Sequence, residues 1–279
     1  MTRLIRLLRR HGAVLALFPA LVWGAQAQNA FNEGIKLYKA GKYADSVAAF
    51  NRALKAAPNS DEAYNNRGLA HFKLGQIDNA LKDYDAAIKL NPRLSEAFFN
   101  RGNAHLAQKN YERAARDYDE VIKHEPNAAH AYRQRGLVYN QLKQFEKAVG
   151  DFNQAQKMAP KDAEIYYQRG LAYRRLGKND LAVQDFTQAI KLEPRNAESY
   201  NNRANGYSLL GRYDEAIKDY DEAIRLDSKN AKLYANRGVI RARLGRSDDA
   251  QGDFRKAIEL DPALKDSLEP LIAQLKGKS

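Results

Sequence analysis

Apolar and small residues recur along this chain at helical spacing, in blocks of fixed length. In the block Ser60–Pro92 they form one stripe on each of two predicted helices: Tyr64, Gly68 and His71 on the first, and Ala80, Tyr84 and Ala87 on the second. Close copies of this block follow one another, and Gly68 and Gly102 stand 34 residues apart. A period of that length indicates stacked supersecondary units and not one closed core.

A glycine in the first helix aligns the copies. It is Gly34, Gly68, Gly102, Gly136, Gly170 and Gly238, with Ala204 in its place in the sixth, so the chain carries seven copies. Small residues let two helix backbones approach closely, and an aromatic such as Tyr84 fills the space between them. A second glycine closes the first helix in a left-handed conformation; Lys109 and Lys143 replace it in two copies, where we expect a less favourable turn. Proline ends the second helix of six copies.

These residues resemble the signature of the tetratricopeptide repeat, and the resemblance covers Ala27 to Leu264. An arginine stands where the family usually has leucine before the glycine. The resemblance implies an all-α fold, a right-handed α-solenoid of seven helix-turn-helix repeats with a concave face made by the first helices. It also implies protein binding, which is what most such folds do. The apolar spacing of Leu264–Leu275 predicts a C-terminal capping helix, in which Pro270 indicates a kink or a late start.

The N-terminus has the pattern of a secretory signal peptide: a basic start, an apolar run over Gly12–Gly24 and the small-x-small sequence Ala25-Gln26-Ala27. Cleavage before Gln28 would divide the chain into a leader (1–27), seven repeats (28–264) and the cap (265–279). An uncleaved membrane anchor is the alternative, although the apolar run is short for a span. The chain has no cysteine, which excludes disulfides and thiolate chemistry. We expect an exported, periplasmic bacterial protein.

The net charge of +12 falls to +8 without the four leader arginines. Much of the rest is a row near the ends of the second helices: Lys55, Lys89, Lys123, Lys157, Lys191 and Arg225. An aspartate precedes three of them by four residues, in the order that favours helical ion pairs: Asp85, Asp119 and Asp221. We interpret the row as a solvated outer face and expect no nucleic acid, because it lacks interleaved aromatics for base stacking. Weak attraction to another polyanion stays open.

The sequence shows no catalytic constellation. His71 and His105 stand where later copies have tyrosine, so packing between helices is the simpler interpretation, and no histidine belongs to a HExxH-type pair. No glycine-rich phosphate loop follows a predicted strand. We therefore expect no enzymatic activity, no cofactor and no metal.

Every copy carries a carboxamide two residues before the aligned glycine: Asn32, Asn66, Asn100, Gln134, Gln168, Asn202 and Asn236. A side-chain amide donates and accepts, so this ladder can pair with the backbone of an extended peptide of any sequence. In some tetratricopeptide proteins asparagine at this position holds peptide backbone, and the resemblance implies that role here. The alternative is that the amides brace neighbouring helices. One residue earlier, selectivity would come from Phe99, Arg133 and Tyr167. A clamp for a C-terminal carboxylate is rejected, because its set of cations is absent.

An arginine before the glycine and an aspartate in the second helix recur together in six copies: Arg67 and Asp83, Arg101 and Asp117, Arg135 and Asp151, Arg169 and Asp185, Arg203 and Asp219, Arg237 and Asp253. The first copy lacks both. Pairing inside a copy then leaves no residue over, and we predict a structural ion pair between the two helices of each repeat.

The sequence thus predicts an exported scaffold that binds a protein or peptide partner in the concave groove, without stable membrane insertion once the leader is cleaved. A homo-oligomer stays open. Two other interpretations remain: a non-catalytic subunit of an envelope enzyme or assembly complex, and a self-assembling structural scaffold.

Overall fold

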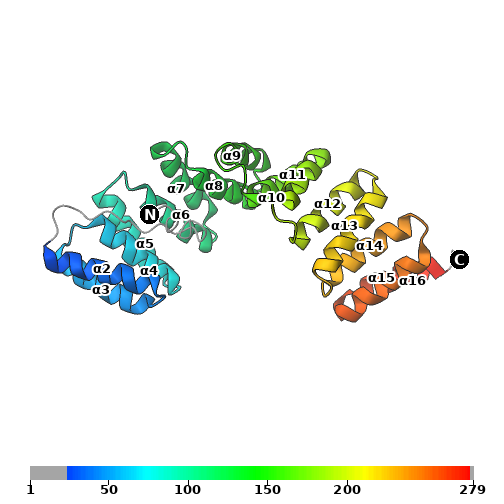
Figure 1. The fold of residues 1–279 in the computed structure, drawn as a ribbon, viewed down its shortest axis with the longest axis horizontal. Helices are drawn as coiled ribbons and strands as arrows, with labels where there is room; N and C mark the ends of the chain where they lie inside the picture. Colours follow the sequence, from blue (N-terminus) through cyan, green and yellow to red (C-terminus); the bar gives the residue numbers. More distant parts are fainter. Residues whose placement is uncertain (1–23, 277–279) are drawn as a thin grey trace. The chain divides into compact units, whose positions relative to one another are not determined.

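The computed structural model describes residues 24–276, and that part of the chain contains fifteen α-helices, one short 3-10 helix and no strand (Figure 1). Each predicted repeat forms two helices joined by a tight turn, so the all-α fold of stacked helix pairs is confirmed. In chain order the helices are α2 (Ala25–Lys39), α3 (Tyr43–Ala56), α4 (Asp61–Lys73), α5 (Ile77–Leu90), α6 (Ser95–Ala107), α7 (Tyr111–His124), α8 (Ala129–Gln141), α9 (Phe145–Met158), α10 (Ala163–Arg175), α11 (Asn179–Leu192), α12 (Ala197–Leu209), α13 (Tyr213–Leu226), α14 (Ala231–Arg243), α15 (Ser247–Leu260), η1 (Pro262–Leu264) and α16 (Lys265–Lys276).

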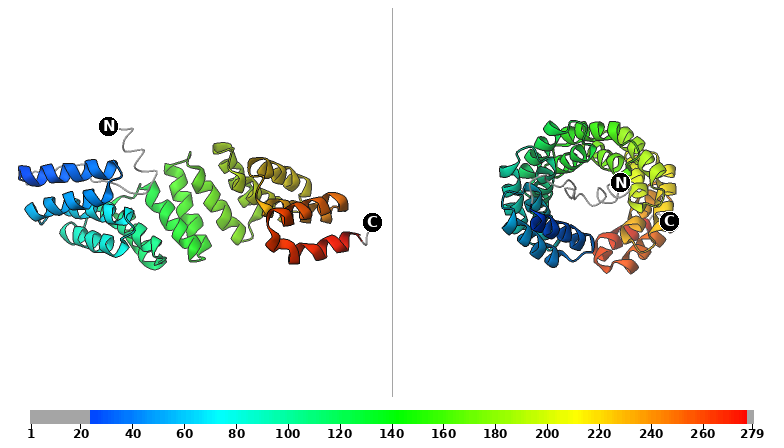
Figure 2. Two further views of the ribbon diagram at one scale, coloured as in Figure 1. Left: turned by 90° about the horizontal axis from the view of Figure 1, so that it is seen from below. Right: turned by 60° about the vertical axis from the view of Figure 1, so that its left-hand side comes forward.

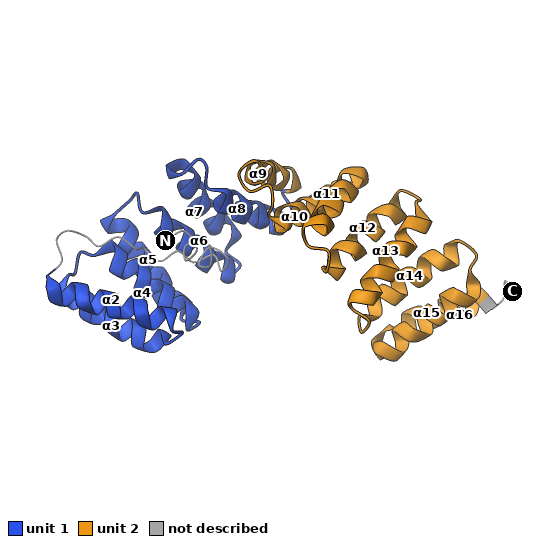
Figure 3. Ribbon diagram, in the orientation of Figure 1, with its two compact units in different colours: residues 1–144 blue, residues 145–279 orange. Residues whose placement is uncertain are grey.

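The chain forms two compact units, which divide after Gln144 (Figure 3). The first unit contains α2 to α8 and the second contains α9 to α16, so the division falls between the two helices of the fourth repeat. Within each unit every helix packs antiparallel against the next one along the chain (Figure 2). First helices of neighbouring repeats also contact each other, α2 with α4, α4 with α6 and α10 with α12. We call the side made by α2, α4, α6 and α8, or by α10, α12 and α14, the first-helix face.

Most of the predicted leader lies outside the described residues. The helix α2 begins at Ala25, and Ala27 is buried in it. Cleavage before Gln28 stays a prediction, and it would remove the first turn of α2 together with Ala27.

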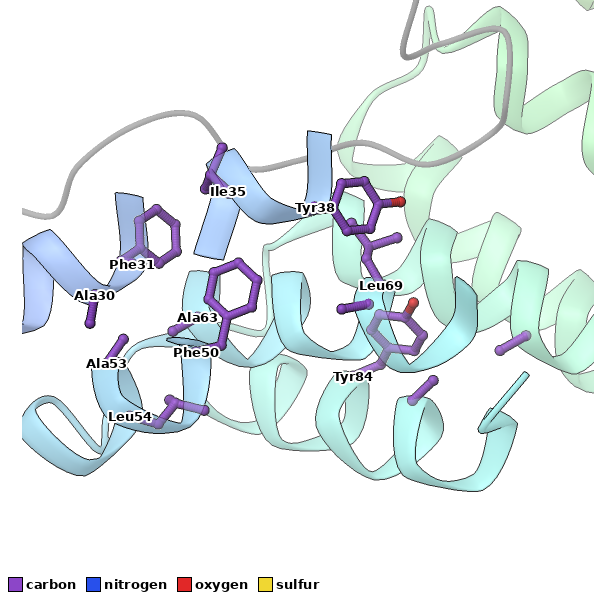
Figure 4. Close-up of a cluster of buried hydrophobic side chains, with 13 residues drawn as sticks. Ala30, Phe31, Ile35, Tyr38, Phe50, Ala53, Leu54, Ala63, Leu69 and Tyr84 are labelled. Atoms are coloured by element: carbon purple, nitrogen blue, oxygen red, sulfur yellow. The ribbon is translucent and has the colours of Figure 1, made fainter. Parts of the chain in front are cut away.

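A ring of the second helix packs directly on the aligned glycine of the first. A Cβ atom built on Gly68 would lie 2.7 Å from Cε1 of Tyr84, and one on Gly34 would lie 2.7 Å from Cε1 of Phe50. Phe50 and Tyr84 occupy the centre of the core between these helices, together with Phe31 and Leu69 (Figure 4). The glycine is therefore required for the close approach of an aromatic ring to the first helix, and not for an unusual backbone conformation.

The turn inside each repeat has the predicted left-handed residue. The backbone angle φ is +74° at Gly75, and the two lysines that replace glycine adopt it as well, with φ of 60° at Lys109 and 58° at Lys143. A side chain in this conformation costs on the order of 1 kcal/mol. The third and fourth repeats therefore contain the expected less favourable turns.

The C-terminal helix covers the last repeat. The helix α16 begins at Lys265 directly after η1, and it continues through Pro270. A late start is therefore not what the structure shows. Leu268 and Leu275 are buried in one cluster with Phe254 and Ala257 of α15. This is the covering that the end of a repeat array needs.

Two glycines of the last repeat provide a matched test of the ring contact. A Cβ on Gly238 would lie 2.7 Å from Cε1 of Phe254, whereas one on Gly252 would meet nothing within 4 Å. We expect Gly238→Ala to lower the free energy of unfolding by ~1–3 kcal/mol through overpacking. Gly252→Ala should raise it by roughly 0.5–1 kcal/mol, because alanine is the better helix former. Urea titration followed by circular dichroism measures both, and equal effects would contradict the ring contact.

Candidate functional site

The carboxamide ladder lies on the first-helix face, and its members differ in exposure. Asn32 is exposed, whereas Asn66, Asn100 and Asn202 are buried, with exposed fractions of 0%, 2% and 7%. The remaining amides, Gln134, Gln168 and Asn236, are half-buried. The seven positions are therefore equivalent in sequence but not in their surroundings.

Four ladder amides link neighbouring first helices, and one of them is Gln134 on α8, whose Nε2 donates to Asn103 Oδ1 on α6 at 3.2 Å. Asn100 Nδ2 donates to Asn65 Oδ1 at 3.0 Å, between α6 and α4. The same spacing of 35 residues joins Asn202 Nδ2 to the Tyr167 hydroxyl at 3.2 Å, and Asn236 Nδ2 to Asn201 Oδ1 at 3.3 Å. In these places the amide nitrogen braces two repeats, which is the alternative that the sequence left open.

The other ladder amides bond more locally. Asn66 Nδ2 donates to the Glu62 carbonyl at 2.9 Å, one turn earlier on α4. The side chain of Gln168 is one methylene longer than that of asparagine, and its Nε2 donates to Glu164 Oε1 at 2.8 Å. In the first repeat, Asn32 Oδ1 accepts from Gln28 Nε2 at 3.1 Å, one turn earlier on α2.

The three expected selectivity residues also lie on the first-helix face. Phe99 is buried, with its ring 4.7 Å from that of His130, centroid to centroid. Arg133 is half-buried on α8. Tyr167 donates from its hydroxyl to Glu198 Oε2 at 3.1 Å, and burial, followed by the Glu198 charge, raises the pKa of Tyr167. Through its hydroxyl, Tyr167 joins α10 to α12.

The repeated arginine binds its own repeat and the preceding one at once. Arg101 donates from Nη2 to Asp117 Oδ1 at 2.6 Å, and from Nη1 to Asp85 Oδ1 of the preceding repeat at 2.6 Å. The contact inside one repeat recurs as Arg67 to Asp83, Arg169 to Asp185, Arg203 to Asp219 and Arg237 to Asp253. In the fourth repeat Arg135 and Asp151 belong to different units, and Arg135 donates to Asp119 at 2.5 Å.

The second bond of the arginine was not expected, and it corrects one expectation. Asp119 binds Arg135 of the next repeat, while Lys123 pairs with Glu120 at 2.9 Å. Asp221 likewise binds Arg237 of the next repeat, while Arg225 pairs with Glu222. Asp85 binds Arg101 of the next repeat. The helical pairs expected for these aspartates with Lys89, Lys123 and Arg225 are therefore wrong. A half-buried guanidinium held in a fixed orientation competes better for a carboxylate than an exposed, mobile side chain.

The guanidinium groups also lie over aromatic rings. The Arg67 Cζ atom is 5.3 Å from the centroid of Tyr64, one turn earlier on α4, and Arg203 lies between Tyr200 and Tyr207 at 5.6 and 5.8 Å. Such cation–π contacts suit arginine and not leucine. They explain how this chain accommodates a charged residue where the family usually has an apolar one.

The buried carboxylates are costly to ionise. Burial raises the pKa of Asp117 and of Asp185, although Arg101 and Arg169 act in the opposite direction. The ion pairs therefore largely offset the cost of desolvation instead of adding a net stabilisation, as is common for buried pairs. We interpret their role as fixing which helices meet and in which register.

Removing one partner of such a pair should cost more than removing both. Arg169→Met would leave Asp185 buried without its cation and should lower the free energy of unfolding at neutral pH by roughly 3–5 kcal/mol. The double variant Arg169→Met/Asp185→Leu should recover most of that loss. Urea unfolding of both variants, repeated at acidic pH, tests this, because protonation of Asp185 should reduce the cost of the single change. A double variant as unstable as the single one would contradict the argument.

A tyrosine of the second helix bonds to the first-helix face in two repeats. The Tyr118 hydroxyl donates to Asn103 Oδ1 at 2.7 Å, and the Tyr220 hydroxyl donates to Asn205 Oδ1 at 2.8 Å. Tyr84 has Leu69 at that position, and its buried hydroxyl has no partner. The sequence analysis missed this pairing, although the sequence contains a signal for it. Two repeats with tyrosine in the second helix have asparagine at the facing position of the first helix, whereas the repeats with phenylalanine have an aliphatic residue there.

The two kinds of tyrosine should respond differently to loss of the hydroxyl. Tyr118→Phe should lower the free energy of unfolding by ~1 kcal/mol, since the bond to Asn103 is lost. Tyr84→Phe should leave it unchanged or raise it by up to about 1 kcal/mol, because a buried, unpaired hydroxyl is removed. Thermal or urea unfolding of the two variants provides the measurement. An equal loss in both would show that the Tyr84 hydroxyl has a partner in solution.

Other kinds of site find no support in the described residues. Within residues 24–276 no helix combines the length and the apolar character that a bilayer span needs. Over the same range no three His, Cys, Asp or Glu side chains gather into a group that could hold a metal. His105 is buried beside Asp117, with Nε2 4.0 Å from Oδ2, and desolvation lowers its pKa.

Stacked helix pairs with a ring-on-glycine contact in five repeats, at Gly34, Gly68, Gly102, Gly170 and Gly238, define an α-helical repeat scaffold. Models of the tetratricopeptide repeat match residues 31–96, 99–163, 163–196, 197–230 and 231–264. The chain belongs to the tetratricopeptide repeat family. A comparison with curated proteins gives no match.

Solved structures share this fold at low identity. The C-terminal part of a TPR repeat-containing protein from Cytophaga hutchinsonii has a TM-score of 0.71 and 20% identity, over 86% of this chain and 98% of that one. A tetratricopeptide repeat protein from Parabacteroides merdae has a TM-score of 0.64 and 22% identity, over 91% and 100%. YrrB, described as a TPR protein with an unusual peptide-binding site, has a TM-score of 0.59 and 21% identity, over 64% and 93%. Likeness at these identities shows the fold alone.

Proposed function

We propose that this chain is an exported scaffold that binds an extended segment of another protein along the first-helix face, without catalysis of its own. The family supports the interaction role, since tetratricopeptide repeats serve in protein–protein recognition. YrrB is a precedent for a peptide site on this fold. Export rests on the leader pattern of residues 1–27.

The proposal is carried by a group of polar atoms on α4 and α6 that lack partners. Asn66 Oδ1, Asn100 Oδ1 and Asn65 Nδ2 are buried and form no hydrogen bond. Roughly 90% or more of buried polar groups are paired, so these atoms on α4 and α6 are candidates for hydrogen bonds with a ligand that displaces the side chains covering them. A peptide main chain offers both the donors and the acceptors that these atoms need.

The ladder can be tested in the first unit with a matched control on the second helices. Peptides selected from a random library against the full chain provide the probe, and fluorescence anisotropy gives their affinities. Asn66→Ala/Asn100→Ala should weaken binding by about tenfold or more, because two hydrogen bonds of ~0.5–1.5 kcal/mol each are lost. Circular dichroism and thermal unfolding report whether loss of the Asn100–Asn65 brace disturbs the fold. The control Lys89→Ala/Lys123→Ala should bind like the unaltered chain at moderate salt. A loss confined to the lysine variant would place the site on the second helices and favour a polyanion.

A further inference from the structure

A cavity of about 560 Å³ lies in the first unit between α5, α6 and α7. Its lining includes Leu81 of α5, Phe98 and His105 of α6, and Arg113 and Arg116 of α7. The cavity is on the side of α6 that faces the second helices, so it is not part of the first-helix face. Its volume is within the range of roughly 300–1,000 Å³ that is usual for ligand pockets.

The third repeat has smaller side chains at this place than the sixth. Phe98 and His105 stand where the sixth repeat has two tyrosines. The rings of those residues, Tyr200 and Tyr207, lie 5.6 and 5.8 Å from the guanidinium carbon of Arg203. Phenylalanine lacks the hydroxyl group of tyrosine, and an imidazole is smaller than a phenol ring. We attribute the cavity to these two exchanges.

Four carboxylates also line the cavity. Each of them already has a cation within 2.9 Å: Asp85 and Asp117 have Arg101, Asp119 has Arg135, and Glu120 has Lys123. A carboxylate that is paired in this way attracts a further cation only weakly, because its charge is largely neutralised at short range. The acidic residues of the cavity therefore do not favour a cationic ligand.

Two cations of the same cavity have no such partner. Arg113 and Arg116 are exposed on α7, and within residues 24–276 neither of them forms a hydrogen bond or an ion pair. Desolvation lowers the pKa of His105, which is buried. Asp117 opposes this shift, whereas the charges of Arg101 and Arg113 add to it. The imidazole is therefore neutral at pH 7, and the two guanidinium groups of α7 are the charged donors left for a ligand.

We propose that this cavity binds a carboxylate group that is joined to an apolar body. The guanidinium groups of Arg113 and Arg116 match the two oxygens of a carboxylate. Leu81 and Phe98 provide an apolar surface for the rest of the ligand. A phosphate dianion suits the cavity less well, because four carboxylates line it and like charges at short range are unfavourable. This second site goes beyond the proposed function and does not depend on the first-helix face.

The test uses the full chain labelled with ¹⁵N-arginine and three small probes: N-acetylphenylalanine, its uncharged methylamide, and N-acetylglycine, which has the carboxylate without an apolar side chain. N-acetylphenylalanine should shift the Nε signals of Arg113 and Arg116. Each of the other two probes should bind weaker by about tenfold or more, because one lacks the charge-assisted hydrogen bonds and the other lacks the apolar contact. Equal binding of either one would overturn the assignment.

Two further probes define the ligand more closely. The carboxylate can belong to the C-terminus of a partner or to an internal acidic residue, and N-acetyl-aspartyl-phenylalanine amide represents the second source. The tighter binder of this probe and N-acetylphenylalanine identifies the source, and either result supports the site. Inorganic phosphate should bind more weakly than both. Phosphate that binds more tightly would refute a carboxylate site.

Removal of the two arginines should weaken this binding and leave the fold intact, because both side chains are exposed. Arg113→Gln/Arg116→Gln should lower the affinity for N-acetylphenylalanine by about tenfold or more, as measured by saturation-transfer NMR of the probe. The control Lys82→Gln/Lys218→Gln removes the same charge from the position of Arg116 in two other repeats, and it should bind like the unaltered chain. An equal loss in both variants would indicate attraction by net charge alone and would count against the site.

A change of shape without loss of the arginines tests the cavity itself. His105→Tyr introduces the residue that the sixth repeat has at this position, Tyr207, and fills part of the cavity. It should lower the affinity for N-acetylphenylalanine by about tenfold or more, whereas the same change in the second repeat, His71→Tyr, should not. Thermal unfolding checks that both variants fold. Full affinity in a folded His105→Tyr variant would place the probe on the exposed surface of α7 and refute the cavity site.

Discussion

In five repeats an arginine bonds in two directions, to its own repeat and to the preceding one, and the junctions depend on it: Arg67, Arg101, Arg169, Arg203 and Arg237. Arg101 holds Asp117 of its own repeat with one side of its guanidinium and Asp85 of the preceding repeat with the other, above the ring of Phe98. Because the donors lie in one rigid plane, the angle between the two helices of a repeat and the placement of the preceding second helix are set together. An apolar leucine at this position could pack, but it could not specify both contacts.

This construction separates what holds the repeats together from what they can recognise. The rings on glycine and the arginine contacts involve the second helices and the side of the first helices that faces them. The first-helix face is then free to vary from repeat to repeat. Tyr167 and Gln168 complete the hydrogen bonds of one junction internally, whereas Asn65 and Asn66 leave those of another open. A difference of a few side-chain atoms thus changes a closed polar contact into a candidate ligand site.

Much of the fold could be predicted because its determinants are local. The small residues opposite Tyr84 and the turn residues Gly75 and Lys109 each act within their own repeat, and the structure has them as expected. The targets of Asp85 and Asp119 could not be predicted in the same way. For each aspartate, a lysine on its own helix and an arginine of the next repeat compete as partners. The arginine forms the ion pair because it is the more buried of the two, and the sequence does not show burial.

The sequence by itself determined the number of repeats, the two helices of each and the position of the carboxamide ladder, because helical periodicity and a fixed period place residues on faces without reference to the rest of the chain. Only the tertiary structure decided what each ladder amide does. At the seven equivalent positions, the amide bonds to a neighbouring repeat or within its own helix, and in some places its oxygen has no partner, depending on which neighbours are within reach. Hydrogen bonds need contact within about 3 Å, and such contacts between repeats exist only once the helices are packed.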